Sequence, residues 1–293
     1  MKKDRYQMIT DIVIEQMENL GSDWMKSWST NAMSGHHNVI SKKAYQGTNT
    51  FLTAISSFKN GFKSNQWGTY KQWQSKGYSV KKGSKGTDII FFDKIKIEDA
   101  ETKEERFIPI LKGFSIFNAD QIQDYWSGSA IPVKPTFKHE QTEQLVTNSQ
   151  AIIKHGGNRA FYTSDADFIQ MPHKTDFKDV DGANAMQNYY STLLHELTHW
   201  TGHTSRLDRK LANKFGSNAY AFEELVAEVG SVFLTAMLGI EKKPQPNHAK
   251  YLNGWLEVLK QDKRAMVKAF GLAQKASDYI LAYQDSNQLQ AAE

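Results

Sequence analysis

The chain has 293 residues, of which 40% are hydrophobic and 23% charged, a balance that argues against global disorder. It contains no cysteine, which excludes disulfides and thiolate ligands, so any metal must be held by histidine or carboxylate groups. Acidic residues interrupt the N-terminal segment, which is therefore not a signal peptide, and the longest apolar run, residues 229–240, is too short to span a bilayer. We expect a cytoplasmic protein with no membrane partner.

The positive charge is concentrated in one part of the chain. The formal net charge is only +4, too small by itself to indicate a nucleic-acid partner. Between residues 40 and 96, however, eleven lysines stand against two aspartates, a local charge of +9. This basic region favours an anionic partner.

The N-terminal part of the chain predicts a mixture of helices and strands. Apolar spacing and terminal glycines predict helices at residues 6–19, 49–61 and 69–77. Two runs of β-branched and aromatic residues, 89–97 and 107–117, flank a charged connector and predict a strand hairpin. Residues 1–127 are therefore expected to form a small α+β domain.

The stretch SGSAIPVKP, rich in glycine, serine and proline, predicts a linker at residues 128–136. After it we expect a helix that ends at Gly156, then a strand and turn in residues 159–172. Further helices are predicted at residues 185–201, 219–238 and 249–283, the last broken near Gly271. The fold class is thus α+β, with a mainly helical C-terminal domain over residues 137–293.

The string HELTH lies inside the helix predicted at residues 185–201. His195 and His199 are four residues apart, so on a helix they share a face and can reach one ion. Glu196, on the adjoining side, can act as the general base for a water molecule at that ion. This is the H-E-x-x-H arrangement of zinc metallopeptidases, so we predict Zn²⁺, with Mn²⁺ as an alternative.

A catalytic zinc site needs a third protein ligand and an open position. Glu224 and Glu228 are four residues apart on a predicted helix, so one can bind the ion while the other supports an imidazole. We assign Glu224 as the ligand and Glu228 as the support, and leave the reverse assignment open. Glu223 is expected to face solvent. His203 is less suitable, because the third histidine of the metzincin string would fall at Ser205.

Such a site would hydrolyse an amide, with Glu196 accepting a proton and delivering it to the leaving amine. Tyr162, Tyr189 or His203 could donate a hydrogen bond to the oxyanion, and the sequence does not rank them. The segment preceding the metal helix, residues 161–172, is expected to bind an extended peptide by edge pairing. The alternative is that the histidines are ordinary buried side chains, which would leave three polar groups on the helix without a stated partner.

Aromatic residues interleave the basic region. Exposed rings beside lysines are typical of surfaces that bind single-stranded nucleic acid without reading its sequence. The turn KKGSKGT adds three lysines on a glycine-rich backbone that a phosphate can approach closely. Alternatively, most of the rings form a domain core and the lysines only solubilise it. The candidate DNA-binding residues are Lys42, Lys43, Trp67, Tyr70, Lys71, Lys81, Lys82 and Lys85.

Several segments resemble ArdC-type antirestriction proteins, which are encoded on conjugative plasmids and other mobile elements. AFYTSDADFIQMP, NYYSTLLHELTHWTGHTSRLDR and FEELVAEVGSVFL resemble the C-terminal domain of that family, and QGTNTFLTA, WGTYKQWQSKG, VKKGSKGTDIIFF and FSIFNADQ its N-terminal domain. The resemblance covers nearly the whole chain. It implies a single-stranded DNA-binding domain followed by a zincin-like metallopeptidase domain, and a role in protecting incoming DNA from host restriction. It places the metal ligands on His195, His199 and the glutamate of EELVAE, with Glu196 as the base.

Three functions stay open at this point. The first is a DNA-tethered zinc peptidase with an antirestriction role and an unidentified protein substrate. The second is a protein that coats single-stranded DNA and whose metal site is only structural; Glu196 argues against it, because a structural site does not need a base. The third is a general cytosolic peptidase, which predicts no retardation of an oligonucleotide at moderate salt.

Overall fold

The computed structural model describes residues 4–21, 24, 35–98, 105–125, 137–180, 182–209, 211, 216–241 and 248–284. These residues divide into two compact units. The first unit contains residues 4–8, 35–98 and 105–125, and the second contains residues 9–21, residue 24 and the described residues from 137 onward. Among the described residues, no helix is long and apolar enough to cross a membrane. The predicted linker, residues 128–136, lies outside the described residues.

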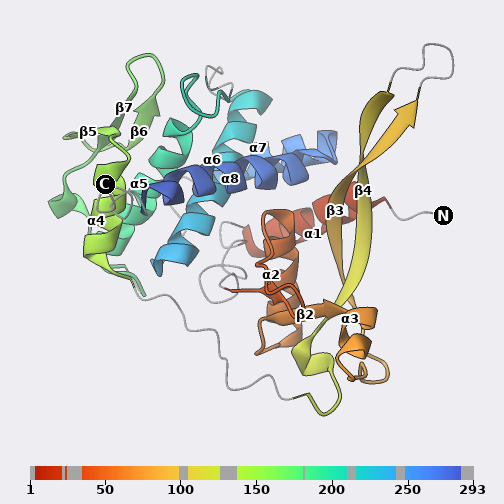
Figure 1. The fold of residues 1–293 in the computed structure, drawn as a ribbon. Helices are drawn as coiled ribbons and strands as arrows, with labels where there is room; N and C mark the ends of the chain where they lie inside the picture. Colours follow the sequence, from red (N-terminus) through yellow and green to blue (C-terminus); the bar gives the residue numbers. More distant parts are fainter. Residues whose placement is uncertain are drawn as a thin grey trace, which may run out of the picture. The chain divides into compact units, whose positions relative to one another are not determined.

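The first unit is built on a four-stranded sheet of order β1-β2-β4-β3. Its strands are β1 (His37–Asn38), β2 (Gln66–Thr69), β3 (Thr87–Glu98) and β4 (Glu105–Asn118). β1 pairs with β2 in parallel, and the other neighbours are antiparallel. The predicted hairpin is confirmed: β3 and β4 form a long two-stranded ribbon (Figure 1).

Two helices of the first unit, α2 (Thr48–Asn60) and α3 (Tyr70–Ser75), also confirm the sequence prediction, and a short 3-10 helix, η3 (Ala119–Gln121), follows β4. Helix α2 ends at Gly61, whose φ of 67° is a conformation that glycine adopts without steric cost. Helix α3 begins at a capping box in which Thr69 accepts a hydrogen bond from the Gln72 backbone N–H. The largest buried rings of this unit are Phe51, Trp67 and Trp73.

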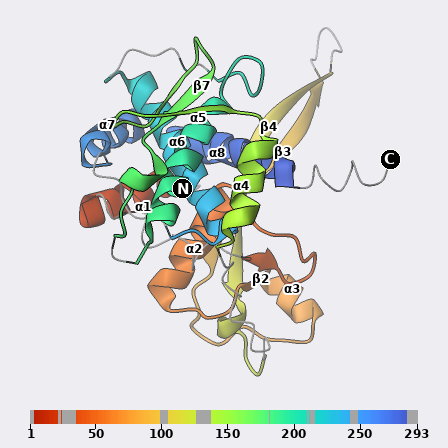
Figure 2. The same ribbon diagram turned by 90° about the vertical axis from the view of Figure 1, so that its left-hand side faces the viewer.

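The second unit is mainly helical, as predicted. Its helices are α1 (Arg5–Leu20) from Ile9 onward, α4 (His139–Asn148), α5 (Ala185–Trp200), α6 (Asn218–Leu238), α7 (His248–Gln261) and α8 (Ala265–Leu281), with the 3-10 helices η4 (Lys174–Asp176) and η5 (Ala282–Gln284). Helix α6 is buried along almost its whole length because it packs against α5, α7 and α8 (Figure 2). Gly230 of α6 permits the contact with α5: a Cβ atom there would lie 2.6 Å from Cγ2 of Thr198.

Most of α1 belongs to the second unit, although the sequence placed residues 1–127 together. Ile9, Val13 and Met17 are fully buried, and the Thr10 hydroxyl donates to the Lys263 carbonyl at 2.9 Å. The apolar spacing predicted the helix, but that spacing does not say which unit covers its apolar stripe.

A small three-stranded sheet lies beside α5. Its strands are β5 (Ile152–His155), β6 (Phe161–Thr163) and β7 (Phe168–Met171), in the order β5-β7-β6. β7 pairs in parallel with β5 and antiparallel with β6. β6 is therefore an edge strand, and it contacts α5.

Two predicted helix boundaries are wrong. The helix expected to end at Gly156 ends at Asn148, and Ile152–His155 form β5 instead, because the β-branched pair Ile152 and Ile153 joins the sheet. The long C-terminal helix is broken at residues 262–264 and continues through Gly271. At this break the Asp262 side chain accepts a hydrogen bond from the Arg264 backbone N–H at 2.8 Å, and this Asx turn favours a non-helical backbone between the two helices.

Candidate metal centre

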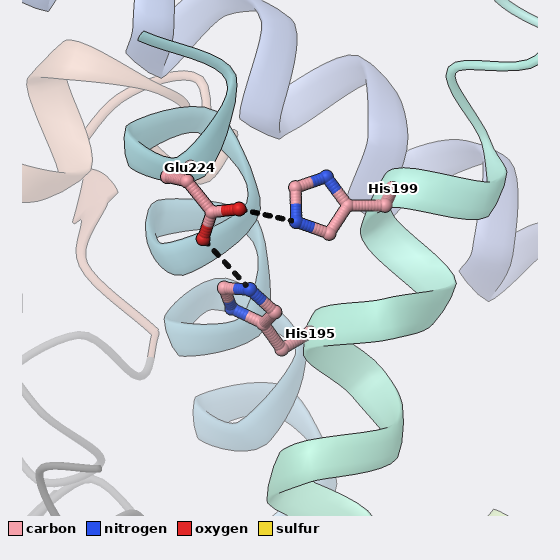
Figure 3. Close-up of side chains that lie close together, drawn as sticks. All are labelled: His195, His199 and Glu224. Carbon is pink, nitrogen blue, oxygen red and sulfur yellow. Dashed lines mark ion pairs between the residues drawn. The ribbon is translucent and has the colours of Figure 1, made fainter. Parts of the chain in front are cut away.

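Two helices bring the predicted metal ligands together. Helix α5 begins at a capping box, in which Asn184 accepts a hydrogen bond from the Gln187 backbone N–H, and runs unbroken to Trp200. It therefore carries the rings of His195 and His199 on one face, with centroids 4.9 Å apart. Glu224 approaches from α6, and Figure 3 shows its carboxylate between the two imidazoles.

The spacing of the three side chains fits a divalent cation. Nε2 of His195 and Nε2 of His199 each lie 3.6 Å from an oxygen of Glu224, which is long for a hydrogen bond. It is close to the roughly 3.4 Å that separates two ligands of a tetrahedral zinc ion. Two imidazole nitrogens and one carboxylate oxygen suit zinc and other divalent first-row metals. Within the described ranges, these three residues are the one group of this kind.

The Nδ1 atom of each imidazole contacts a further glutamate of α6. Nδ1 of His195 lies 3.2 Å from Oε2 of Glu228, and Nδ1 of His199 lies 3.2 Å from Oε1 of Glu223. Such contacts orient a histidine so that its other nitrogen faces the metal. Glu228 thus lies where a supporting role requires. The expectation that Glu223 faces solvent is wrong: it is 8% exposed, because the side of α6 that carries it packs against α5.

Arg209, which the sequence did not single out, is part of the same network. Its guanidinium contacts Glu223 at 2.9 Å and donates to the Thr201 hydroxyl at 2.8 Å and the Thr198 carbonyl at 2.6 Å. Arg209 therefore joins the end of α5 to α6 and supplies a cation to a group of buried glutamates. Nothing in the local sequence signals this role, because Arg209 lies in the connection after α5 and meets Glu223 only after folding.

The charge balance at Glu223 leads to a stability prediction. We expect Arg209→Leu to lower the free energy of unfolding by about 3–5 kcal/mol, because Glu223 would stay buried without its cation. Urea denaturation of the metal-free protein measures the change. Lys268→Ala is the control, since it breaks an exposed pair with Asp262 and should cost at most about 1 kcal/mol. Equal losses in the two variants would contradict the prediction.

The pKa values of the candidate ligand Glu224 and the candidate base Glu196 shift in opposite directions. Burial opposes protonation of His195, but Glu224 and Glu228 outweigh this effect and raise its pKa to about 10. For Glu224, burial favours the neutral acid, yet the two histidines lower its pKa to about 2. Burial raises the pKa of Glu196 above its usual value, against the opposing effects of the histidines and a backbone hydrogen bond from Tyr162. Glu224 is therefore the more strongly ionised of the two carboxyl groups.

The three candidate ligands and Glu196 line a cavity of about 470 Å³. The rest of its lining is Asn158, Arg159, Ala160, Phe161, Tyr162, Ser164, Pro172, Phe177, Thr192, Leu211, Tyr220, Glu223, Glu228, Tyr251 and Trp255. Tyr220 and Tyr251 were not singled out from the sequence, and their hydroxyl oxygens are 3.2 Å apart. Burial and the Tyr251 contact raise the pKa of Tyr220, so both phenols keep their protons at neutral pH.

Of the three oxyanion donors that the sequence suggested, only Tyr162 lies in the cavity. Tyr162 lines the cavity, but its hydroxyl donates to Asp167 at 2.8 Å and accepts from Arg206 at 3.2 Å. Tyr189 contacts His155 at 2.9 Å, and His203 contacts the Ser205 hydroxyl at 2.7 Å. Neither Tyr189 nor His203 is among the residues that line the cavity.

The candidate DNA-binding residues fall into two groups. The six lysines are all exposed, and so is Tyr70, at 54%. Trp67 is fully buried: it packs with Ile89 and Ile116, and its Nε1 donates to His36 at 2.7 Å. The prediction that Trp67 stacks on a base is therefore wrong, because its ring lies on the face of the sheet that packs into the core.

Comparison with known proteins agrees with this architecture. Residues 140–271 match the family model of a zincin-like metallopeptidase, and residues 3–117 match the N-terminal domain of the anti-restriction factor ArdC. The chain thus combines an ArdC-type N-terminal domain with a zincin-like domain that brings two histidines and a glutamate together.

Solved structures show the family. The crystal structure of the antirestriction ArdC protein from the R388 plasmid is 36% identical in its metal-free form, with a TM-score of 0.81 over 97% of this chain and 99% of that one. The Mn(II)-bound form of the same protein gives 35% identity and a TM-score of 0.80, over 96% and 98% of the two chains. This chain belongs to the ArdC antirestriction family.

Of two relatives found by sequence, one has nearly the length of this chain and the other is much longer. An uncharacterized protein, y4eC, from Sinorhizobium fredii is 34% identical over 295 residues, which cover 97% of this chain and 94% of the relative. A DNA primase, TraC, from Escherichia coli is 35% identical over 313 residues, and the match spans 28% of its length. The ArdC-like pair of domains therefore also occurs within a longer protein.

Proposed function

We propose that this chain is an antirestriction protein that binds single-stranded DNA and carries a zinc-dependent metallopeptidase site, which acts on an unidentified protein in the cytoplasm and protects incoming mobile-element DNA. The observation that supports it most is the convergence of His195 and His199 on Glu224 in a cavity that also contains Glu196. Zinc is the proposed ion because two imidazoles and a carboxylate are a zinc ligand set. Manganese is the alternative, since a solved relative is Mn(II)-bound.

Different residues of the cavity would bind the metal ion, transfer the proton and stabilise the oxyanion during amide hydrolysis. A divalent ion held by His195, His199 and Glu224 would make water more acidic and polarise the scissile carbonyl. Glu196 follows His195 on α5 and lines the same cavity, so its carboxylate would accept the proton of the attacking water and return it to the leaving amine. Tyr220 and Tyr251 both line the cavity, with their hydroxyl oxygens 3.2 Å apart, so either phenol could donate a hydrogen bond to the oxyanion.

The edge strand β6 supports a peptide as the substrate. It pairs with β7 on one side and contacts α5, and Phe161 and Tyr162 line the cavity. An extended peptide that adds to this edge would pass over Glu196. Arg159 is the one lysine or arginine among the residues that line the cavity, so it favours a substrate with a carboxylate a few residues from the scissile bond.

Charge supports single-stranded DNA as the second partner. The six exposed candidate lysines lie in the region of local charge +9, and the ArdC-type domain covers that region. Lysines neutralise phosphates and release counterions, so binding of this kind is strong at low salt and weakens as salt rises.

Metal removal tests the proposal as a whole. We expect chelation with EDTA to abolish hydrolysis of a denatured protein substrate and re-addition of Zn²⁺ or Mn²⁺ to restore it, while retardation of a single-stranded oligonucleotide continues throughout. Metal analysis, a gelatin or casein assay and gel retardation measure the three properties. A purified protein that holds no metal and behaves identically under chelation would favour a DNA-coating protein without peptidase chemistry.

A further inference from the structure

Among the ribbon side chains whose burial is described, three phenylalanines of β3 and β4 are exposed to solvent. Phe91 is 57% exposed, Phe92 54% and Phe114 45%. Phenylalanine is usually buried, and apolar rings that gather on a surface commonly mark an interaction site. Phe114 was not among the aromatic residues considered from the sequence.

The pairing register shows which of these rings share a face. Phe91 lies opposite Lys112, and Ile89 lies opposite Phe114. Directly opposed residues of an antiparallel pair point to the same side, so Phe91, Lys112 and Phe114 share one face of the ribbon. Phe91 and Phe114 are diagonal neighbours, roughly 7–8 Å apart. Phe92 points to the opposite face, because neighbouring residues of a strand alternate.

The two faces differ in what covers them. On the side of Phe92, the Arg5 side chain lies against Gly113, and Ile90 is only 3% exposed. On the side of Phe91 and Phe114, the diagonal neighbours Ile89 and Ile116 pack on Trp67 in the core. The rings of Phe91 and Phe114 thus lie on the same face as this core but are exposed to solvent. The exposed Lys112 lies opposite Phe91.

We propose that Phe91 and Phe114 form a stacking platform for the bases of single-stranded DNA, and that Lys112 contacts the backbone phosphate between them. This inference rests on the proposed DNA binding of the chain and names the surface that performs it. Unpaired bases stack on aromatic side chains whatever their sequence, and rings on the face of a sheet are a common way to bind them.

The chemistry of the surrounding unit favours a nucleic acid over an apolar protein surface. The region that contains β3 has a local charge of +9, and Lys81, Lys82 and Lys85 immediately precede this strand and are exposed. A partner recognised only through apolar contacts would gain nothing from this excess of lysine. A single DNA strand offers both flat bases for the rings and phosphates for the lysines.

Fluorescence anisotropy of the full chain with a labelled oligo-dT tests the platform. We expect Phe91→Ala and Phe114→Ala each to raise Kd about tenfold, from the loss of one stacked base, whereas Phe91→Trp keeps its affinity. Phe92→Ala is the matched control, because it removes a ring of similar exposure from the same strand as Phe91 but from the opposite face, and it should bind like the unmodified chain. Circular dichroism and thermal unfolding check that all variants stay folded.

The salt dependence of binding distinguishes the contribution of the two rings from that of Lys112. Lys112→Gln should reduce the slope of log affinity against log salt by about 0.7, the loss of one phosphate contact on a single strand, and the phenylalanine variants should leave the slope unchanged. If the unmodified chain binds but Phe91→Ala and Phe114→Ala lose no more affinity than Phe92→Ala, the platform is wrong and the proposed DNA binding stands. If the unmodified chain does not bind the oligonucleotide, both proposals fall.

Discussion

Replacing Glu196 by glutamine is expected to slow protein hydrolysis by about 10²- to 10⁴-fold without changing the metal content. The amide has nearly the same shape as the carboxylate but cannot accept the proton of the attacking water. His195, His199 and Glu224 are untouched by the change, so the site should still bind its ion. Hydrolysis of a denatured protein and metal analysis after dialysis measure the two properties.

The control for this change is Glu257→Gln, an exposed glutamate of α7 outside the cavity, which should leave hydrolysis unaltered. Glu196→Gln should also keep its affinity for single-stranded DNA. If this variant hydrolyses protein as fast as the unmodified chain, Glu196 is not the base. If hydrolysis is lost but protection of incoming DNA in cells is retained, the peptidase chemistry does not produce the antirestriction effect.

Replacing Glu224 by alanine should weaken metal binding by more than about 100-fold, a larger effect than any other glutamate of α6 should show. Glu224 is the only one of the three whose carboxylate faces Nε2 of both histidines. Glu223→Gln and Glu228→Gln remove groups that only orient an imidazole, so each should cost about 10- to 100-fold. Calorimetric titration of the metal-free variants with Zn²⁺ and with Mn²⁺ measures the affinities.

The ranking of these variants decides between the two assignments of the third ligand. Should Glu228→Ala abolish binding while Glu224→Ala keeps it, the reverse assignment holds and Glu224 is the supporting residue. Circular dichroism of each metal-free variant separates a lost ligand from a lost fold. This control matters because Glu228 is 1% exposed and every change there disturbs the contact of α6 with α5.

Much of the fold could be predicted from local patterns. Helices with a clear apolar stripe, such as α1 and α2, and the β3–β4 hairpin follow from spacing within the segment itself. The errors came where two local signals compete. Residues 149–156 continue the apolar spacing of α4, but Ile152 and Ile153 pair with β7 and form part of strand β5. At the C-terminal helix pair, the helix is interrupted at the Asx turn of Asp262, and Gly271 is accommodated within the second helix at a cost of only about 1 kcal/mol.

The sequence by itself determined that His195, Glu196 and His199 lie together, because a spacing of four residues on one helix is a local property. It also indicated a basic N-terminal region with many aromatic rings. Only the tertiary structure decided that Glu223 and Arg209 hold the site, and that Trp67 is buried while Phe114 faces solvent. Burial and pairing depend on which surfaces of distant segments meet, and the order of residues within one segment does not encode that.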